Sequence, residues 1–114
     1  MPYTHFRQGY YINERGKIKR IRKNKKYDVT TYLSSAGYKY FLIYHSSGYD
    51  KYYVHRVVAM VFLKRIKGKY IVDHIDGNKV NNHKSNLRWV TQQENCMNKE
   101  CHRKRSEAQR RVSE

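Results

Sequence analysis

The spacing of hydrophobic and polar positions divides the chain into a β-prone first half and a mixed second half. In the first half, short runs of aromatic and β-branched residues recur at hairpin intervals, which is typical of antiparallel strands. The expected strands are 9–13, 18–21, 29–33, 38–44 and 51–54. The first two should pair around a turn at Gly16, and residues 22–28 should form a basic loop. The first half is therefore expected to be one small antiparallel sheet.

The second half changes its hydrophobic period. Its expected order is a buried helix (55–63), a basic loop (64–69), a strand (70–73), a polar loop (74–85) and a second strand (86–91). Thr91 and Glu94 have the spacing of a capping box, which predicts a helix from residue 92 to about 105. The expected fold class is α+β, with the sheet first, then a strand–loop–strand–helix unit, then a basic helical tail.

The charge points to a polyanionic partner. The chain has 25 Lys and Arg against 9 Asp and Glu, a formal net charge of +16. Such an excess repels itself unless a polyanion offsets it, and nucleic acid releases counterions when phosphates are neutralised. One basic group comprises Lys17, Lys19, Arg20, Arg22, Lys23, Lys25 and Lys26, and a second comprises Lys99, Arg103, Lys104, Arg105, Arg110 and Arg111. An acidic membrane surface is disfavoured, because the basic segments lack a broad hydrophobic face.

Length and composition exclude several classes of protein. A chain of 114 residues fits one domain, with room for a tail. No apolar run approaches the roughly 20 residues of a membrane-spanning helix, and the first residues lack the apolar region of a secretory signal. Two cysteines are too few for a disulfide framework. We therefore expect a protein that is not secreted and that works in the cytoplasm, with no membrane partner.

Three polar residues of the second half are expected to converge. Asp73 and His74 close the first of its two strands, and Asn95 lies one turn into the following helix. A helix packed across a hairpin brings its first turn over the strands. The three side chains would then offer two oxygen ligands for a hard divalent cation and one imidazole.

The long polar loop before the second strand is costly unless it has a role. Asp76, Gly77 and Asn78 are expected to form a turn within it, with Asp76 as an extra metal ligand being the lesser alternative. Asn81, Asn82 and His83 are expected to hydrogen-bond the backbone of the loop itself.

The stretch 73–95, DHIDGNKVNNHKSNLRWVTQQEN, resembles the ββα-metal motif of the HNH endonuclease family, in the form carried by phage and intron-borne homing endonucleases. Residues 54–62 resemble the helix that precedes this motif. Residues 9–13 and 16–20, with Gly37 and Tyr38, are similar to the DNA-contacting sheet that often accompanies it. The implied regions are 1–54 (β-rich, DNA-contacting), 55–98 (nuclease motif) and 99–114 (basic helical tail).

The resemblance implies a role for each residue of the motif. Asp73 and Asn95 would ligate a single Mg²⁺ or Mn²⁺, and His74 would be the general base. Asn86 would hold the loop and orient the His74 ring through its second nitrogen. The implied substrate is double-stranded DNA, cut in one strand or both to a 5′-phosphate and a 3′-hydroxyl. Many family members carry His where this chain has Asn95, an asparagine form that also occurs among phage nicking enzymes.

DNA contacts are expected from both basic groups and from the second strand of the motif. The expected contact residues are Lys17, Lys19, Arg20, Arg22, Lys23, Lys25, Lys26, Arg88, Arg103, Lys104 and Arg105. Arg88 alternates outward from Leu87 and Trp89, so it is predicted to reach a phosphate. A DNA-binding protein with a silent nuclease site is the alternative, whereas an RNA-binding function would leave 73–95 unexplained. A monomer and a homodimer both remain open.

Overall fold

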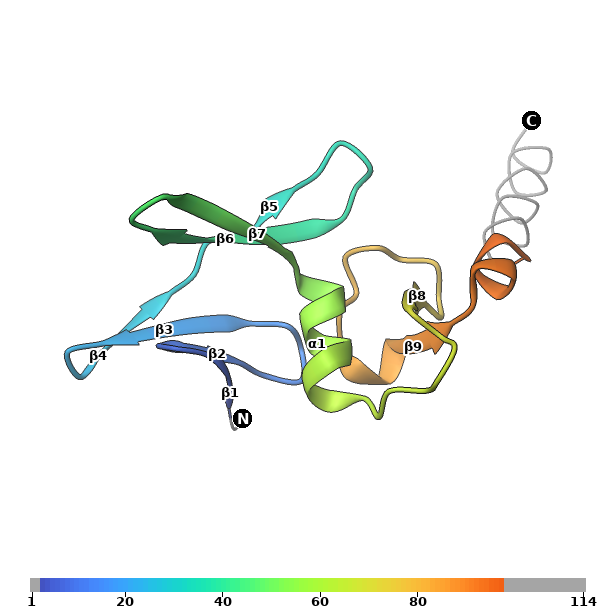
Figure 1. The fold of residues 1–114 in the computed structure, drawn as a ribbon, viewed down its shortest axis with the longest axis horizontal. Helices are drawn as coiled ribbons and strands as arrows, with labels where there is room; N and C mark the ends of the chain where they lie inside the picture. The colour runs from blue at the N-terminus through green and yellow to red at the C-terminus, as the bar shows by residue number, and fades with distance from the viewer. Residues whose placement is uncertain (1–2, 98–114) are drawn as a thin grey trace, which may run out of the picture.

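The computed structural model describes residues 3–97, in which two antiparallel sheets, a helix and a β-hairpin follow one another along the chain (Figure 1). The strands are β1 (Thr4–Arg7), β2 (Tyr10–Ile12), β3 (Ile18–Arg22), β4 (Lys25–Asp28), β5 (Tyr32–Leu33), β6 (Lys39–His45), β7 (Gly48–Tyr53), β8 (Ile71–His74) and β9 (Leu87–Val90). Helix α1 (Val54–Phe62) separates β7 from β8, and the short 3-10 helix η1 (Lys84–Asn86) precedes β9. An α+β fold of small sheets and helices is confirmed.

The first sheet has the order β1-β2-β3-β4. The predicted hairpin around Gly16 is confirmed, since β2 pairs antiparallel with β3. The basic loop predicted over 22–28 is wrong, because Lys25–Asp28 pairs with β3 as a strand. Lys23 and Asn24 both have positive φ, 50° and 63°. Two such residues form the tight turn that suits the twist of a hairpin, so β3 continues directly into β4.

The second sheet has the order β5-β6-β7 and is separate from the first, so the expectation of one sheet is wrong. The strand predicted over 29–33 is reduced to Tyr32–Leu33. The reason lies at Val29, whose N–H donates to Ile18 O of the first sheet at 3.1 Å, so the chain changes sheets after this residue. The last strand of this sheet, β7, begins at Gly48 and so before the predicted strand 51–54, because His45 at the end of β6 pairs directly with Gly48.

Helix α1 lies between the two sheets and the β8–β9 hairpin (Figure 1). Val57, Val58 and Ala59 are at most 1% exposed and belong to one hydrophobic core that draws from all three units. The helix predicted over 55–63 is present, but it begins and ends one residue earlier than predicted. Trp89 of β9 is also buried in this core.

The helix that follows β9 begins where the sequence predicts. Glu94 N donates to Thr91 Oγ1 at 3.1 Å and Thr91 N donates to Glu94 Oε1 at 3.3 Å, which is the reciprocal pattern of a capping box. Residues 92–97 are helical. The continuation to about residue 105 and the basic tail lie outside the described residues. Within the described part, no helix has the length and hydrophobicity needed to span a bilayer.

Both sheets send a turn onto the loop that joins β8 to β9, here called the 75–86 loop. From the first sheet, Gly16 has a φ of 84° and so close an approach that a Cβ would lie 2.8 Å from Val54 Cγ1 and 3.2 Å from Asn82 Cβ. Lys84 N also donates to Glu14 O at 2.8 Å. From the second sheet, Ala36 O accepts from Lys79 Nζ at 2.7 Å. The path of the loop therefore depends on the first half of the chain.

Candidate active site

Asp73, His74 and Asn95 line one pocket of about 380 Å³. Asp73 and His74 come from the end of β8, and Asn95 comes from the helix over 92–97. All three are buried, at 7%, 5% and 9% exposure. The remaining lining residues are Ala36, Tyr38, Val72, Gly77 and Lys79. The structure therefore brings the three expected residues to one pocket, and the roles predicted for them stay predictions. The contribution of Ala36 and Tyr38 was not predicted, because no sequence pattern indicates that the turn before β6 reaches this pocket.

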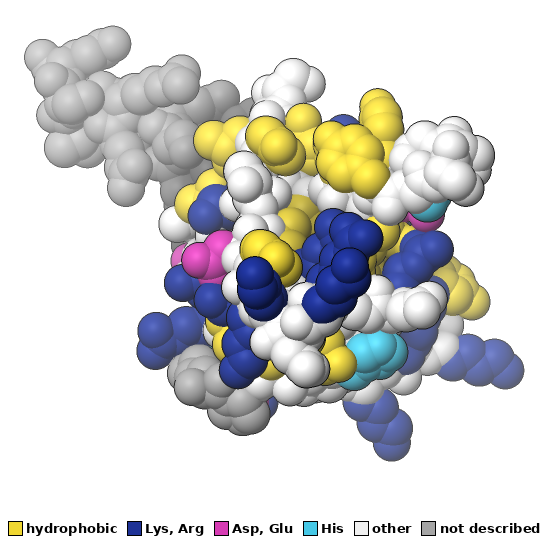
Figure 2. All heavy atoms as spheres, turned by 90° about the vertical axis from the view of Figure 1, so that its left-hand side faces the viewer, with side chains coloured by type: hydrophobic (Ala, Val, Ile, Leu, Met, Phe, Trp, Pro, Cys, Tyr) yellow, Lys and Arg dark blue, Asp and Glu magenta, His cyan; other side chains and the backbone are white. Residues whose placement is uncertain are grey.

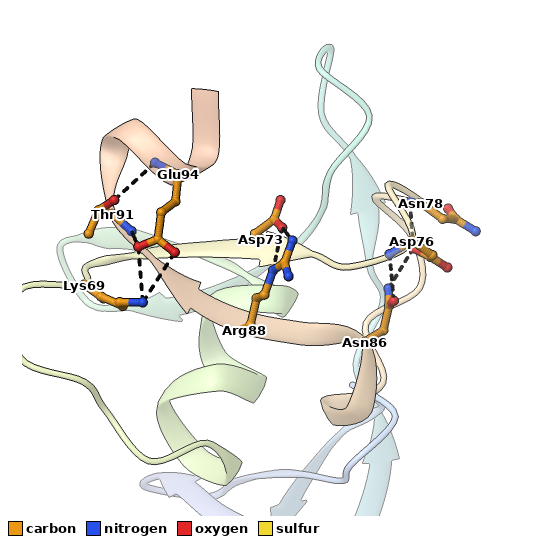
Figure 3. Close-up of polar contacts among 8 residues, drawn as sticks. All are labelled: Lys69, Asp73, Asp76, Asn78, Asn86, Arg88, Thr91 and Glu94. Atoms are coloured by element: carbon orange, nitrogen blue, oxygen red, sulfur yellow. Dashed lines mark hydrogen bonds and ion pairs between the residues drawn. The ribbon is translucent and has the colours of Figure 1, made fainter. Parts of the chain in front are cut away.

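Arg88 lies against Asp73 rather than pointing away from it. Asp73 and Arg88 are register partners on β8 and β9, and Arg88 Nε donates to Asp73 Oδ2 at 3.0 Å (Figure 3). A second nitrogen of the guanidinium is also 3.0 Å from this oxygen. The Arg88 guanidinium, which was predicted to reach a phosphate, therefore neutralises the carboxylate of Asp73, the predicted metal ligand. The guanidinium has five N–H donors, so donors remain for a phosphate.

The imidazole of His74 is held by Asn82. His74 Nε2 lies 2.8 Å from Asn82 Oδ1, and both residues are buried. An amide oxygen can only accept, so Nε2 carries the hydrogen and donates it. The neutral ring then has its lone pair on Nδ1. Asn82 was expected to bind the loop backbone, and its contact with His74 corrects that expectation.

Asn86 holds the loop, but among the described residues its side chain makes no hydrogen bond to His74, so the predicted orienting role is wrong. Its Nδ2 donates to Asp76 Oδ1 and to Asn81 O, both at 2.9 Å. Its Oδ1 accepts from Asp76 N at 3.1 Å (Figure 3). Asn86 thus joins the two ends of the loop, while the orienting contact to the His74 ring comes from Asn82.

Asp76 anchors the turn that follows β8. The predicted turn is confirmed, since Gly77 N donates to His74 O at 2.9 Å and Asn78 N donates to Asp76 Oδ1 at 2.7 Å. Hydrogen bonds from Asn81, Asn78 and Asn86 lower the pKa of Asp76 below its usual value. This carboxylate is therefore engaged within the loop.

The donors in the pocket fit a hard divalent cation. Asp73 offers a carboxylate oxygen and Asn95 an amide oxygen, both of the kind that Mg²⁺ and Mn²⁺ prefer. Mg²⁺ is typically held by few protein oxygens and keeps several waters, which leaves positions for a phosphate. In the described part of the chain, no three His, Cys, Asp or Glu side chains gather as a richer metal cluster.

Most of the first basic group lies on β3, β4 and their connecting turn, at the end of the molecule away from the pocket, whereas Lys17 lies beside Gly16 in the turn that reaches Asn82. Figure 2 shows this end, where Lys and Arg side chains gather near the centre of the face. Among the described residues, only Lys19 of this group pairs with an acid, Asp28. A cavity of about 460 Å³ opens here, and its lining includes Arg20 and Arg22. Arg103, Lys104 and Arg105 of the second basic group lie outside the described residues.

Comparison with known proteins identifies relatives that cover most of the chain. Residues 52–97 match the family model described as HNH endonuclease. YosQ, an SPbeta prophage-derived protein of Bacillus subtilis (strain 168) named as an HNH homing endonuclease, is 40% identical over 91 residues, covering 77% of this chain and 50% of YosQ. The DNA endonuclease I-HmuI of Bacillus phage SP01 is 34% identical over 89 residues, covering 78% of this chain and 50% of I-HmuI.

A solved structure agrees with these relatives. It is described as DNA binding and cleavage by the HNH homing endonuclease I-HmuI, and it superposes with a TM-score of 0.74 at 30% sequence identity. The match covers 90% of this chain and 59% of that chain. The chain spans about half the length of the two curated relatives.

Proposed function

Because this chain belongs to the HNH endonuclease family, we propose that it is a metal-dependent endonuclease that hydrolyses phosphodiester bonds of duplex DNA, as a homing endonuclease does. The observation that carries the proposal is the single pocket lined by Asp73, His74 and Asn95. A carboxylate, an amide oxygen and an imidazole in one pocket are the groups that metal-assisted hydrolysis requires.

His74 acts as the general base in this proposal. Its Nδ1 carries the lone pair because Asn82 fixes the hydrogen on Nε2. Nδ1 takes a proton from water as the water oxygen bonds to phosphorus. The bond from phosphorus to the 3′ oxygen breaks, and that oxygen takes a proton from solvent. The products are a 5′-phosphate and a 3′-hydroxyl.

Asp73 and Asn95 hold the single cation, Mg²⁺ or Mn²⁺. When bound, this cation stabilises the negative charge that develops on the phosphate and on the leaving oxygen. Arg88 keeps the Asp73 carboxylate in place through two contacts to Oδ2. Its remaining donors contact a phosphate of the DNA, in keeping with the sequence-based prediction.

The test is strand cleavage of two substrates. Supercoiled plasmid and a randomised linear duplex are incubated with excess protein and Mg²⁺, Mn²⁺ or EDTA, and new 5′-phosphate ends are captured by ligation. We expect cleavage with either metal and none with EDTA. Relaxed circles indicate nicking, and linear plasmid indicates double-strand cutting. Intact DNA despite measurable binding would instead support the DNA-binding protein with a silent site.

Asn82→Leu is expected to slow cleavage about 10- to 100-fold, because the His74 ring loses the hydrogen bond that orients it, and a misplacement of about 1 Å can cost about 100-fold in rate. Asn82→Asp keeps an oxygen acceptor and should retain most of the rate. Single-turnover rates on a cleaved duplex measure both effects. Asn81→Leu is the matched control, since it removes an amide from the same loop without touching His74. Equal rates for Asn82→Leu and Asn81→Leu would contradict the role of Asn82.

The basic group on β3 and β4 is expected to bind the DNA backbone independently of sequence. Replacing Lys23, Lys25 and Lys26 with Gln should reduce the slope of log affinity against log salt by about 0.9 for each phosphate that is no longer neutralised. Fluorescence anisotropy across a salt series measures the slope. The triple Lys→Arg variant keeps the charge and should keep the slope. An unchanged slope in the Gln variant would remove this turn from the interface.

A further inference from the structure

The imidazole of His74 is packed against two rings that the proposed chemistry does not use. Its ring centroid lies 5.1 Å from that of His55 and 6.0 Å from that of Tyr38. Tyr38 and His55 also contact one another, with centroids 5.1 Å apart. The two supporting rings come from different elements, the turn before β6 and helix α1. The three residues are called the ring triad below.

His55 contributes a buried, neutral ring to the triad. It is 8% exposed, and its Nδ1 is buried without a hydrogen-bond partner. Burial lowers the pKa of His55 to about 4, and the positive charge of the neighbouring Arg56 acts in the same direction. The ring is therefore uncharged near neutral pH and acts on His74 through contact alone.

The 75–86 loop also holds Tyr38 in place, through Lys79. Lys79 Nζ lies 5.0 Å from the centroid of the Tyr38 ring and donates to Ala36 O in the preceding turn. Tyr38 lines the catalytic pocket and also an adjoining cavity of about 230 Å³ that His55 and Asn95 share. Its ring therefore forms a wall of the site beside His74.

We propose that Tyr38 and His55 are positioning residues for His74, which would make the second sheet part of the active site. The proposal rests on the function proposed for His74. One hydrogen bond, from Nε2 to Asn82, leaves an imidazole free to pivot about that bond. Contacts of the two rings with the imidazole remove this freedom and hold Nδ1 in one place. Displacing a reacting group by about 1 Å can cost about 100-fold in rate.

The first test compares three tyrosine variants in single-turnover cleavage with enzyme in excess. Tyr38→Leu should cut about 10- to 100-fold more slowly while its affinity for DNA changes less than about two-fold. Tyr38→Phe keeps the ring and should restore the rate. Tyr40→Leu is the matched control, because Tyr40 lies two residues further along the chain, on β6, and contacts Tyr32 and Tyr53 instead of His74. It should keep the rate.

A second pair of variants carries the test if Tyr38→Leu does not fold. His55→Phe removes the unpartnered Nδ1 but keeps a ring, so it should fold and cleave at close to the wild-type rate. His55→Leu should be slower. In both series, the NMR signal of the His74 ring should shift in the Leu variants, which lose a ring, and stay near its wild-type position in the Phe variants.

Several results would overturn the proposal. Tyr38→Leu cutting as fast as Tyr40→Leu would exclude positioning through the ring, and a loss confined to affinity would instead make Tyr38 a DNA contact. Tyr38→Phe as slow as Tyr38→Leu would assign the effect to the hydroxyl. If the wild-type protein cuts no DNA, the proposed function fails, and the NMR comparison decides: an unmoved His74 signal in the Leu variants would show that these rings do not position it.

Discussion

Replacing His74 with alanine is expected to abolish detectable DNA cleavage while DNA binding survives. The change removes the base that takes a proton from water, and a positioned general base typically contributes about 100- to 10,000-fold. His74 is 5% exposed inside the pocket, so its loss leaves the outer surface unchanged. Single-turnover cleavage and fluorescence anisotropy on the same duplex measure the two quantities separately.

The control for this variant is a histidine from the same loop. His83 caps η1 by accepting from Ser85 N at 3.1 Å and does not line the pocket. His83→Ala should therefore cleave DNA at close to the wild-type rate. A His74→Ala protein that still cuts at a comparable rate would contradict the assignment of the base. Equal losses of cleavage and binding in His74→Ala would instead point to a folding defect.

Asp73→Asn is expected to reduce cleavage by about 1,000-fold or more, because charge stabilisation by a bound metal contributes several kcal/mol to such reactions. The variant keeps the shape of the side chain but loses the charge that attracts the cation. It also leaves Arg88 facing a neutral group. We expect weaker binding of Mn²⁺ in calorimetric titration and no rescue of cleavage at ordinary metal concentrations.

Asp50→Asn is the matched control for Asp73→Asn. Asp50 also pairs with an arginine, Arg7, but it lies on β7 outside the pocket. Its replacement should leave both metal binding and cleavage unchanged. Wild-type Mn²⁺ affinity in Asp73→Asn would contradict the proposed metal site. Wild-type affinity combined with lost cleavage would assign Asp73 a role other than metal ligation.

The parts of the fold that sequence analysis predicted are those where hydrophobic pattern and local signals agree. The β2–β3 hairpin has β-prone arms and a glycine at its turn, and the last helix starts at a capping box. By contrast, all four residues of β4 are exposed, so no hydrophobic alternation marks it as a strand. It forms because the turn at Lys23 and Asn24 carries the chain back along β3. The division into two sheets depends on where the chain leaves the first sheet, after Val29 N donates to Ile18 O, and the hydrophobic pattern does not mark that point.

In the candidate site too, the residues that local signals place were predictable, and the others were not. Asp73, His74 and Asn95 were predictable, because a strand end and a capped helix start determine where they lie. The partner of His74 was not, because the 75–86 loop contains several asparagines and its path depends on turns from the first half of the chain. Gly16 packs beside Asn82, which then reaches the imidazole, while Asn86 closes the loop. The spacing of Asn82 and Asn86 along the sequence could not show which of the two amides contacts His74.

The contact between the β2–β3 turn and the 75–86 loop also limits how this protein can be recombined with its relatives. Gly16 leaves no room for a side chain beside Val54 and Asn82, and Glu14 pairs with Lys84 at 2.9 Å. A chimera that joins the first half of one parent to the second half of another would combine residues at this contact that do not match in size or charge. Exchanging the first sheet between relatives should therefore succeed only when the residues on both sides of this contact are transferred together.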